Sequence, residues 1–452
     1  MTAPASALDE APVRAIHKRT VAVAMGGPFC DGYLLGIIAL ALPQITSQLE
    51  LSGTETGLVA ASALLGVFVG GLLFGPLTDR VGRRVMFVLN LVVFVVASVA
   101  QIWVDEGWQL IGLRLVLGIA IGADYPIASA LTAELVPRKL RGPALSGLVL
   151  GWWVGYAAAY VIGWALRDGG SEAWRWMLVS AAVPAAVFLL LRTGLPESPF
   201  WLASKGRIDE AQKIFVKYFG REASAEEVAA QIDSKYIKRG TGLGNLIAIF
   251  RRGYGIQLLF CSVFWICQVA PAYSLRTFQP QMLNELGIGD TYSASTFITI
   301  LAVVGVVAGM ALINRVGRRG LLVSAFICGT FALTAVALVP HSFALVIVAL
   351  FVLYQCSEAA GSGLQFVYPS ELFPTDLRAT GSGFATAMSR LGATASTFVL
   401  PMTTEALGMT ATLLLGAGIT AVGLVVTVWL APETKSLSLA EASLRSGPQI
   451  RR

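Results

Sequence analysis

A charged hexapeptide occurs twice in this chain, and each copy lies between two long apolar segments. The first copy, DRVGRR, spans residues 79–84, and the second, NRVGRR, spans residues 314–319. A motif that returns in the same apolar setting indicates a chain built from two similar halves. This duplication constrains the fold strongly, because both halves must then hold the same order of segments.

The composition places both halves in a lipid bilayer. Hydrophobic residues make up 56% of the 452 residues and charged residues only 13%, whereas soluble domains carry about 25% charged residues. An apolar helix needs about 20 residues to cross a hydrocarbon core of about 30 Å. About twelve segments reach this length, six in each half. We therefore expect an all-α membrane protein with twelve transmembrane helices.

The expected segments follow the apolar stretches. In the first half they are 20–43, 54–78, 84–104, 108–133, 143–166 and 175–193. In the second half they are 254–280, 291–313, 320–340, 342–367, 381–403 and 407–431. The predicted regions are a tail at 1–19, a six-helix bundle at 20–193, a polar linker with short helices at 194–252, a second six-helix bundle at 253–431 and a tail at 432–452.

The distribution of cations predicts the orientation in the membrane. Lys and Arg gather on the termini, on the linker and on the even-numbered connections, whereas the odd-numbered connections carry acids such as Glu50 and Asp105. By the positive-inside rule, both termini are expected on the cytoplasmic side of a plasma membrane or bacterial inner membrane. The net charge of +6 follows from this bias, so we expect no nucleic-acid partner.

The polar residues do not suggest an enzyme. The chain has two histidines and five cysteines, and no cysteine pair has the spacing of a metal site with histidines. No nucleophile–base set and no phosphate-binding loop can be assembled. We expect no catalytic residue, no bound metal and no cofactor.

Two further motifs return at nearly the same offset as the hexapeptide. An E-x-x-P-x-x-x-R pattern begins at Glu134 and again at Glu371. The sequence PES at 196–198 closes the sixth segment, and PETK at 432–435 closes the twelfth. Three motifs repeated at one offset argue against chance, and a parallel repeat of six plus six helices is a known transporter architecture.

These motifs resemble the loop signatures of the major facilitator superfamily over essentially the whole chain. The stretches that carry the resemblance are GPLTDRVGRR at 75–84, LPESPFWL at 195–202, ELFPTDLRATG at 371–381 and PETK at 432–435. They are similar to the sugar-porter and metabolite:proton symporter branches. The resemblance implies two bundles that rock about a central site.

The charged residues of the repeated motifs are expected to form a gate at the cytoplasmic helix ends. Carboxylates and guanidiniums can pair there, and the bidentate geometry of Arg favours one closed arrangement. The predicted gate consists of Asp79, Arg83, Glu134, Arg141, Glu197, Arg315, Arg318, Glu371, Arg378 and Glu433. The alternative is that these charges only fix the topology.

Ionisable residues inside the predicted helices are candidates for proton coupling, because each costs about 2.5–3.5 kcal/mol at a helix centre unless it faces a cavity or a partner. The candidates are Asp31, Arg114, Asp124 and Glu358. Arg114 resembles the arginine of the fourth helix in the family, which implies that it controls the protonation of Asp31. The alternative is a purely structural buried pair.

The predicted substrate site gathers polar-tipped side chains from apolar spans. Its members are Tyr125, Trp265, Gln268, Tyr273, Gln365 and Arg390. The alternatives are aromatic residues at the lipid interface and glutamines that only bond between helices.

The expected function is secondary active transport of a small organic solute, such as a sugar, a polyol or an organic acid-like metabolite, with proton symport. The expected partners are the solute, protons and the lipid bilayer, and the chain is expected to be a monomer. The alternatives are a proton-linked efflux antiporter, an uncoupled facilitator, and a transporter-like receptor that binds without translocating.

Overall fold

The computed structural model describes residues 12–220 and 242–435, and within these ranges the chain is helical and forms no strand. The first half holds α1 (Ala15–Gln48), α2 (Gly53–Val81), α3 (Arg83–Ala100), the 3₁₀ helix η1 (Gln101–Trp103), α4 (Gly107–Leu135), α5 (Arg138–Leu166), α6 (Ala173–Ser180) and α7 (Ala182–Arg192). The short helices α8 (Pro199–Ser204) and α9 (Ile208–Phe219) follow.

The second half follows after residue 241. It holds α11 (Gly242–Arg251), α12 (Gly255–Thr277), α13 (Gln279–Glu285), α14 (Thr291–Val316), α15 (Arg318–Leu338), α16 (Ala344–Gly361), α17 (Leu364–Leu372) and α18 (Thr375–Leu430). Eleven spans of the described residues are long and apolar enough to cross a membrane. Ten of them are single crossings, whereas α18 is two helices merged across a kink at Gly408. The chain is therefore a multi-pass membrane protein with twelve crossings, as the apolar segments predict.

Several helices extend beyond the apolar segments that predict them. The first helix begins at Ala15 and includes the polar stretch before residue 20, and the tenth continues through α17 to Leu372. The hydrophobic length of a segment reports only the part that lies in hydrocarbon. Backbone hydrogen bonds can carry a helix further into the polar region on either side.

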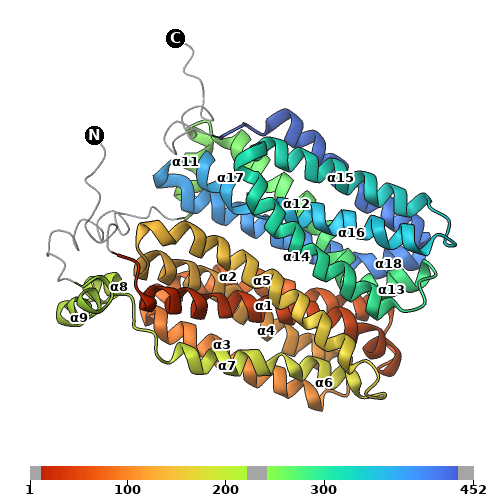
Figure 1. Ribbon diagram of the computed structural model, residues 1–452, viewed down its shortest axis with the longest axis horizontal. Coiled ribbons are helices and arrows are strands. Elements are labelled where there is room, and N and C mark those ends of the chain that lie inside the picture. The colour runs from red at the N-terminus through yellow and green to blue at the C-terminus, as the bar shows by residue number, and fades with distance from the viewer. Residues whose placement is uncertain (1–11, 221–241, 436–452) are drawn as a thin grey trace, which may run out of the picture.

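The two halves lie side by side with their helices along the long axis of the molecule (Figure 1). Helix α2 packs along α18, and α5 packs along α14, so these pairs form much of the contact between the halves. The helices α8 and α9 lie at one end, which we call the linker end, and α13 lies at the opposite end (Figure 1).

Polar contacts join the halves toward the end opposite the linker. The Tyr160 hydroxyl donates to the carbonyl oxygen of Arg276 at 2.8 Å, and the Tyr292 hydroxyl donates to the carbonyl oxygen of Leu40 at 3.1 Å. The Arg167 guanidinium lies 3.2 Å from the Asp290 carboxylate. These contacts connect α1 and α5 to α12 and α14.

Candidate functional site

Asp31 lies at the middle of α1, where it is only 4% exposed. Its carboxylate forms no hydrogen bond or ion pair with another group in the described ranges. The charged side chains that act on it electrostatically are Asp124 on α4, Arg192 on α7 and Arg390 on α18. Because Arg390 belongs to the second half, Asp31 senses a charge across the contact between the halves.

Arg114 does not meet Asp31 in this structure. Its side chain is fully buried on α4, and its Nε donates to the carbonyl oxygen of Val59 on α2 at 3.0 Å. Both terminal nitrogens of Arg114 are buried without a hydrogen-bond partner in the described part of the chain. The control of Asp31 by Arg114 therefore stays a prediction, and this arrangement of the helices does not supply the pair.

Asp124 instead pairs with Arg192, a residue that the sequence analysis did not single out. The Arg192 Nη1 and Asp124 Oδ1 atoms are 2.8 Å apart, and both side chains are 0% exposed. The Asn90 amide donates to the same oxygen at 2.9 Å. The Arg192 Nη1 also donates to the carbonyl oxygen of Phe87 at 2.8 Å, and the guanidinium carbon lies 3.3 Å from the ring centre of Phe87.

This buried pair reaches the helix of Asp31 because of a glycine. A Cβ at Gly27 of α1 would overlap both the Asp124 carboxylate and the Arg192 guanidinium. Arg192 is the last residue of α7, so from sequence it resembles a cation at a membrane surface. Only the packing of α3, α4 and α7 shows that it is buried.

A second buried pair lies between α12 and α16. The Arg276 Nη2 is 3.3 Å from the Glu358 carboxylate, and the two side chains are 3% and 7% exposed. Four aromatic rings lie 4.8–5.8 Å from the guanidinium carbon, and we call them the aromatic cage: Trp152, Trp153, Tyr156 and Tyr273. Three of these rings come from α5, so the cage joins the two halves. Arg276 is not among the predicted site residues, because it lies next to the end of its helix, where a cation is common.

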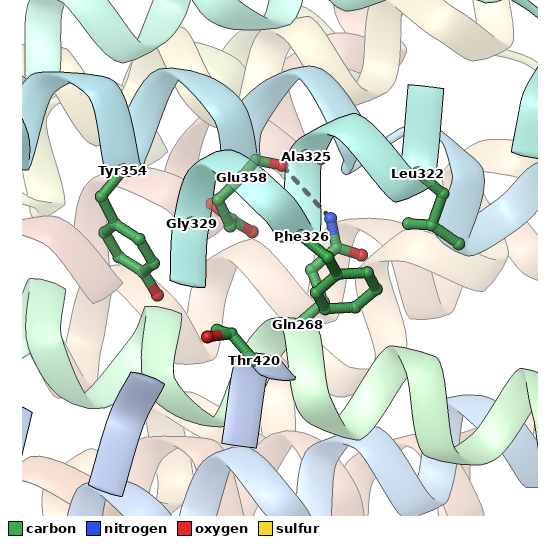
Figure 2. Close-up of a pocket in the computed structure, with 8 residues that line it drawn as sticks. All are labelled: Gln268, Leu322, Ala325, Phe326, Gly329, Tyr354, Glu358 and Thr420. Carbon is green, nitrogen blue, oxygen red and sulfur yellow. Dashed lines mark hydrogen bonds between the residues drawn. The ribbon is translucent and has the colours of Figure 1, made fainter. Parts of the chain in front are cut away.

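Gln268 and Glu358 also line a cavity inside the second half. The Gln268 amide donates to the carbonyl oxygen of Glu358 at 3.2 Å (Figure 2). The full lining is Gln268, Leu322, Ala325, Phe326, Gly329, Tyr354, Glu358 and Thr420. The empty space between these residues is about 270 Å³, a volume that includes open solvent at the mouth. The cavity lies between α12, α15, α16 and α18 rather than between the halves.

The predicted substrate residues separate into distinct places. The Gln365 amide donates to Gln268 at 3.2 Å, and Arg390 Nη1 donates to the Tyr273 hydroxyl at 3.2 Å. Trp265 is 1% exposed and its ring packs edge-on against Phe366, so it does not face lipid. Of the predicted set, only Gln268 lines the cavity of Figure 2. The side chain of Tyr125 lies outside the described residues.

At the linker end, the repeated motifs build the same contact in both halves. The Glu197 carboxylate follows α7 and accepts hydrogen bonds from the first two backbone N–H groups of α3, at 3.1 and 3.0 Å. The Glu433 carboxylate follows α18 and does the same for α15, at 3.0 and 3.1 Å. A carboxylate at a helix N-terminus accepts hydrogen bonds from otherwise unpaired N–H groups, and its negative charge interacts favourably with the positive end of the helix dipole.

Positive backbone angles prepare both of these helix starts. The residues before α3 and α15 are Gly82 and Gly317, with φ of 112° and 92°, a region that glycine adopts without strain. A Cβ on Gly82 would also lie 2.8 Å from the Glu197 carboxylate. The carboxylates of Glu197 and Glu433 can therefore approach these helix starts only because a glycine lies opposite each of them.

The other gate residues are placed only in part. The Arg318 guanidinium lies 3.3 Å from Glu371, and Arg378 Nε donates to the carbonyl oxygen of Phe373 at 3.3 Å. The backbone carbonyl of Arg315 accepts from Lys435 at 2.9 Å. These contacts join helices of the same half. The side chains of Asp79, Glu134 and Arg141 lie outside the described residues, so their part in a gate stays a prediction.

We expect replacement of Glu433 by Gln to remove a pH-dependent part of the stability. Burial raises the pKa of the Glu433 carboxyl, but the backbone N–H groups of Lys435, Arg318 and Arg319 outweigh this and hold the pKa below its usual 4.5. The stabilisation is then complete above about pH 4.5 and is lost as the pH falls through the lowered pKa. Because the Glu433 side chain is exposed, we expect the substitution to lower the free energy of unfolding by only about 0.5–1 kcal/mol.

The measurement is the thermal unfolding midpoint of the detergent-purified protein between pH 7 and pH 4. The wild-type midpoint should exceed that of Glu433→Gln at pH 7, and the difference should shrink toward pH 4. The matched control is Glu405→Gln, since Glu405 is also exposed but lies on α18 away from this contact. Equal pH dependence in the wild type and Glu433→Gln would contradict the assignment.

Known proteins resemble this chain in sequence and in fold. Residues 20–444 match the family model described as sugar (and other) transporter. The putative metabolite transport protein YaaU of Escherichia coli (strain K12) is 38% identical over 97% of this chain and 97% of its own length. The inner membrane metabolite transport protein YgcS of the same strain is 38% identical over 96% of both chains. The structure of the proton:xylose symporter XylE bound to 6-bromo-6-deoxy-D-glucose superposes with a TM-score of 0.75 at 22% identity, covering 95% of this chain and 98% of that one.

Proposed function

The chain belongs to the sugar (and other) transporter family, and from this premise we propose that it moves a small organic solute across a membrane together with protons. The two halves would rock about a site between them and expose it to each side in turn. The relatives at 38% identity are described as metabolite transport proteins. The neighbour of the same fold is described as a proton:xylose symporter, which supports proton coupling.

The observation that carries the proposal is that charged side chains of each half lie at, or act across, the contact between the halves. Asp31 of the first half is acted on by Arg390 of the second half. Arg276 of the second half lies among the aromatic rings of α5 in the first half. Charges in a membrane interior are costly and are typical of ion and proton pathways.

Rocking would change which charges act on Asp31, and this gives a route to coupling. When Arg390 moves away, the ionised carboxylate loses a stabilising charge, so a proton binds more readily. When Arg390 approaches, the proton is released more readily. If these two arrangements open to opposite sides, one proton crosses with each cycle. Arg114, Asp124 and Glu358 remain candidates for a supporting role in this cycle.

The cation bias supports a cytoplasmic position for the linker end and for both termini. The carboxylates Glu197 and Glu433 would then stabilise the cytoplasmic helix ends of the two halves. We also propose that a single chain is sufficient for transport. The contact between its own halves already brings Arg390 to bear on Asp31 and places Arg276 among the rings of α5.

Counterflow in proteoliposomes tests the proposal. Vesicles that contain the purified chain and an excess of an unlabelled solute should transiently concentrate the same solute in labelled form, without any gradient of protons. An inward proton gradient should then raise the steady-state accumulation, and a protonophore should abolish that rise. Counterflow without any effect of the proton gradient would indicate a facilitator. A solute that binds without counterflow would contradict transport and favour a receptor.

A further inference from the structure

Tyr273, on α12, contacts two guanidinium groups. Arg390 Nη1 donates to its hydroxyl oxygen at 3.2 Å, and the Arg276 guanidinium carbon lies 5.1 Å from its ring centre. Glu358 neutralises Arg276 at 3.3 Å. Arg390 forms no ion pair with a carboxylate in the described ranges, and its Nε is buried without a hydrogen-bond partner. Arg390 therefore holds a positive charge that no neighbouring acid neutralises by direct contact.

The position of Arg390 is at the contact between the halves. Its partner Tyr273 packs edge-on against Trp152 of α5, with ring centres 6.1 Å apart. Across this contact, Arg390 acts electrostatically on Asp31 of α1. Among the described residues, the other charged groups that act on Asp31 are Asp124 and Arg192.

The charges around this place can be paired off one by one. Asp124 and Arg192 neutralise each other at 2.8 Å, and Arg276 and Glu358 do so at 3.3 Å. Within the described ranges, Asp31 and Arg390 are then the two charges of this group that no ion pair neutralises, one in each half. Arg114 also lacks an ion pair, but it lies against α2 and is not among the charges that act on Asp31. When Asp31 is ionised, the two offset each other through space. When Asp31 is protonated, the site keeps a net positive charge.

We propose that the transported solute is a monocarboxylate and that its carboxylate binds Arg390 and the Tyr273 hydroxyl. Protonation of Asp31 permits this binding, because it removes the negative charge that would otherwise offset Arg390. This rests on the proposed transport function. A planar guanidinium can donate two parallel N–H···O bonds to one carboxylate, and Arg390 has a buried N–H without a partner for this purpose. By linkage, the bound carboxylate favours protonation of Asp31 by the same factor by which the proton favours the carboxylate.

The proposal fixes the charge that crosses the membrane. One monocarboxylate and one proton enter together without net charge, and no bond in the solute is made or broken. A neutral sugar with one proton would instead carry one positive charge. Uptake of a monocarboxylate should therefore respond to a pH gradient and not to a membrane potential, whereas uptake of a neutral sugar should respond to both.

The binding test uses the full chain in detergent and pairs of probes that differ mainly in charge. The pairs are D-gluconate with D-glucitol, D-galacturonate with D-galactose, and benzoate with benzyl alcohol. At least one carboxylate should raise the thermal unfolding midpoint while its neutral partner does not, since a ligand stabilises the state that binds it. Its dissociation constant should rise by about tenfold or more in Arg390→Gln, because a charge-assisted bond is lost.

Two variants separate a loss of binding from a loss of folding. Arg390→Lys keeps the positive charge and should restore part of the affinity. In Asp31→Asn, affinity for the carboxylate should no longer fall as the pH rises, because the side chain is always neutral. Three results would overturn the inference. They are an unchanged affinity in Arg390→Gln, stabilisation by the neutral members alone, and binding of no carboxylate in the panel.

Transport measurements separate this inference from the proposed function. In proteoliposomes, uptake of the binding carboxylate should follow an imposed pH gradient and should be unaffected by a potassium diffusion potential set with valinomycin. Counterflow of a neutral sugar but of no carboxylate would overturn the monocarboxylate assignment and leave transport intact. Binding without counterflow for every probe would contradict transport itself.

Discussion

Replacing Arg192 by Leu should lower the free energy of unfolding by about 3–5 kcal/mol, because it leaves Asp124 as an unpaired charge in a fully buried place. The two side chains are 0% exposed and 2.8 Å apart. The substitution also removes the bond from Arg192 to the Phe87 carbonyl group. Thermal and denaturant unfolding of the detergent-purified protein would measure the loss.

A double variant and a surface control make this expectation specific. In Asp124→Asn with Arg192→Leu, no charge is left unpaired, so most of the loss should be restored. Arg207→Leu breaks a pair with Glu210 in which both side chains are about half exposed, and it should cost less than about 1 kcal/mol. A loss in Arg192→Leu no larger than in Arg207→Leu would show that the buried pair does not stabilise the first half.

Replacing Asp31 by Asn should abolish accumulation driven by a proton gradient while exchange of solute continues. A gradient of one pH unit supplies about 1.36 kcal/mol for each proton, which supports about tenfold accumulation. Without a carboxyl group that binds and releases a proton, this gradient cannot act on the cycle. Uptake into proteoliposomes with and without an imposed pH gradient, together with counterflow, would measure the two activities separately.

The matched control for this substitution is Asp168→Asn, because Asp168 follows the end of α5 and its side chain is 88% exposed. It should leave gradient-driven accumulation unchanged. If Asp31→Asn still accumulates solute against its gradient, the coupling role moves to Glu358 or Asp124. Loss of both accumulation and counterflow would show instead that Asp31 is needed for the movement or for binding.

The sequence predicts the twelve crossings well, because the length of an apolar run directly reflects the thickness of the bilayer. The duplicated loop motifs also predict paired structures, and the closing carboxylates Glu197 and Glu433 do occupy matching positions in the two halves. The prediction of the crossings depends on the thickness of the bilayer, and the prediction of the paired loops depends on short repeated motifs. Neither requires knowledge of how helices pack side by side.

The partners of the buried charges could not be predicted in the same way. Arg192 and Arg276 lie near helix ends. The positive-inside rule already accounts for a cation at the first place, and anchoring at the membrane interface accounts for one at the second. Their burial results from neighbouring helices that are distant in sequence, as with Asn90 beside Asp124 and Trp153 beside Arg276. The expected pair of Asp31 with Arg114 was implied by family resemblance. A pairing of this kind depends on the arrangement of the helices, which one sequence does not specify.

The aromatic cage around Arg276 adds to the contact between the halves an attraction that depends only weakly on exact position. Attraction between a guanidinium and a ring varies gradually as one moves over the other, whereas a hydrogen bond weakens steeply when its angle changes. The Trp152, Trp153 and Tyr156 rings of α5 would therefore keep an attraction to the Arg276 guanidinium while the halves move as proposed. The directional ion pairs of Asp124 and Glu358 stay inside their own halves. If the halves rock as proposed, the rings can stay attracted to Arg276 at changed angles, whereas the hydrogen bond from Tyr160 to the Arg276 carbonyl oxygen would have to break.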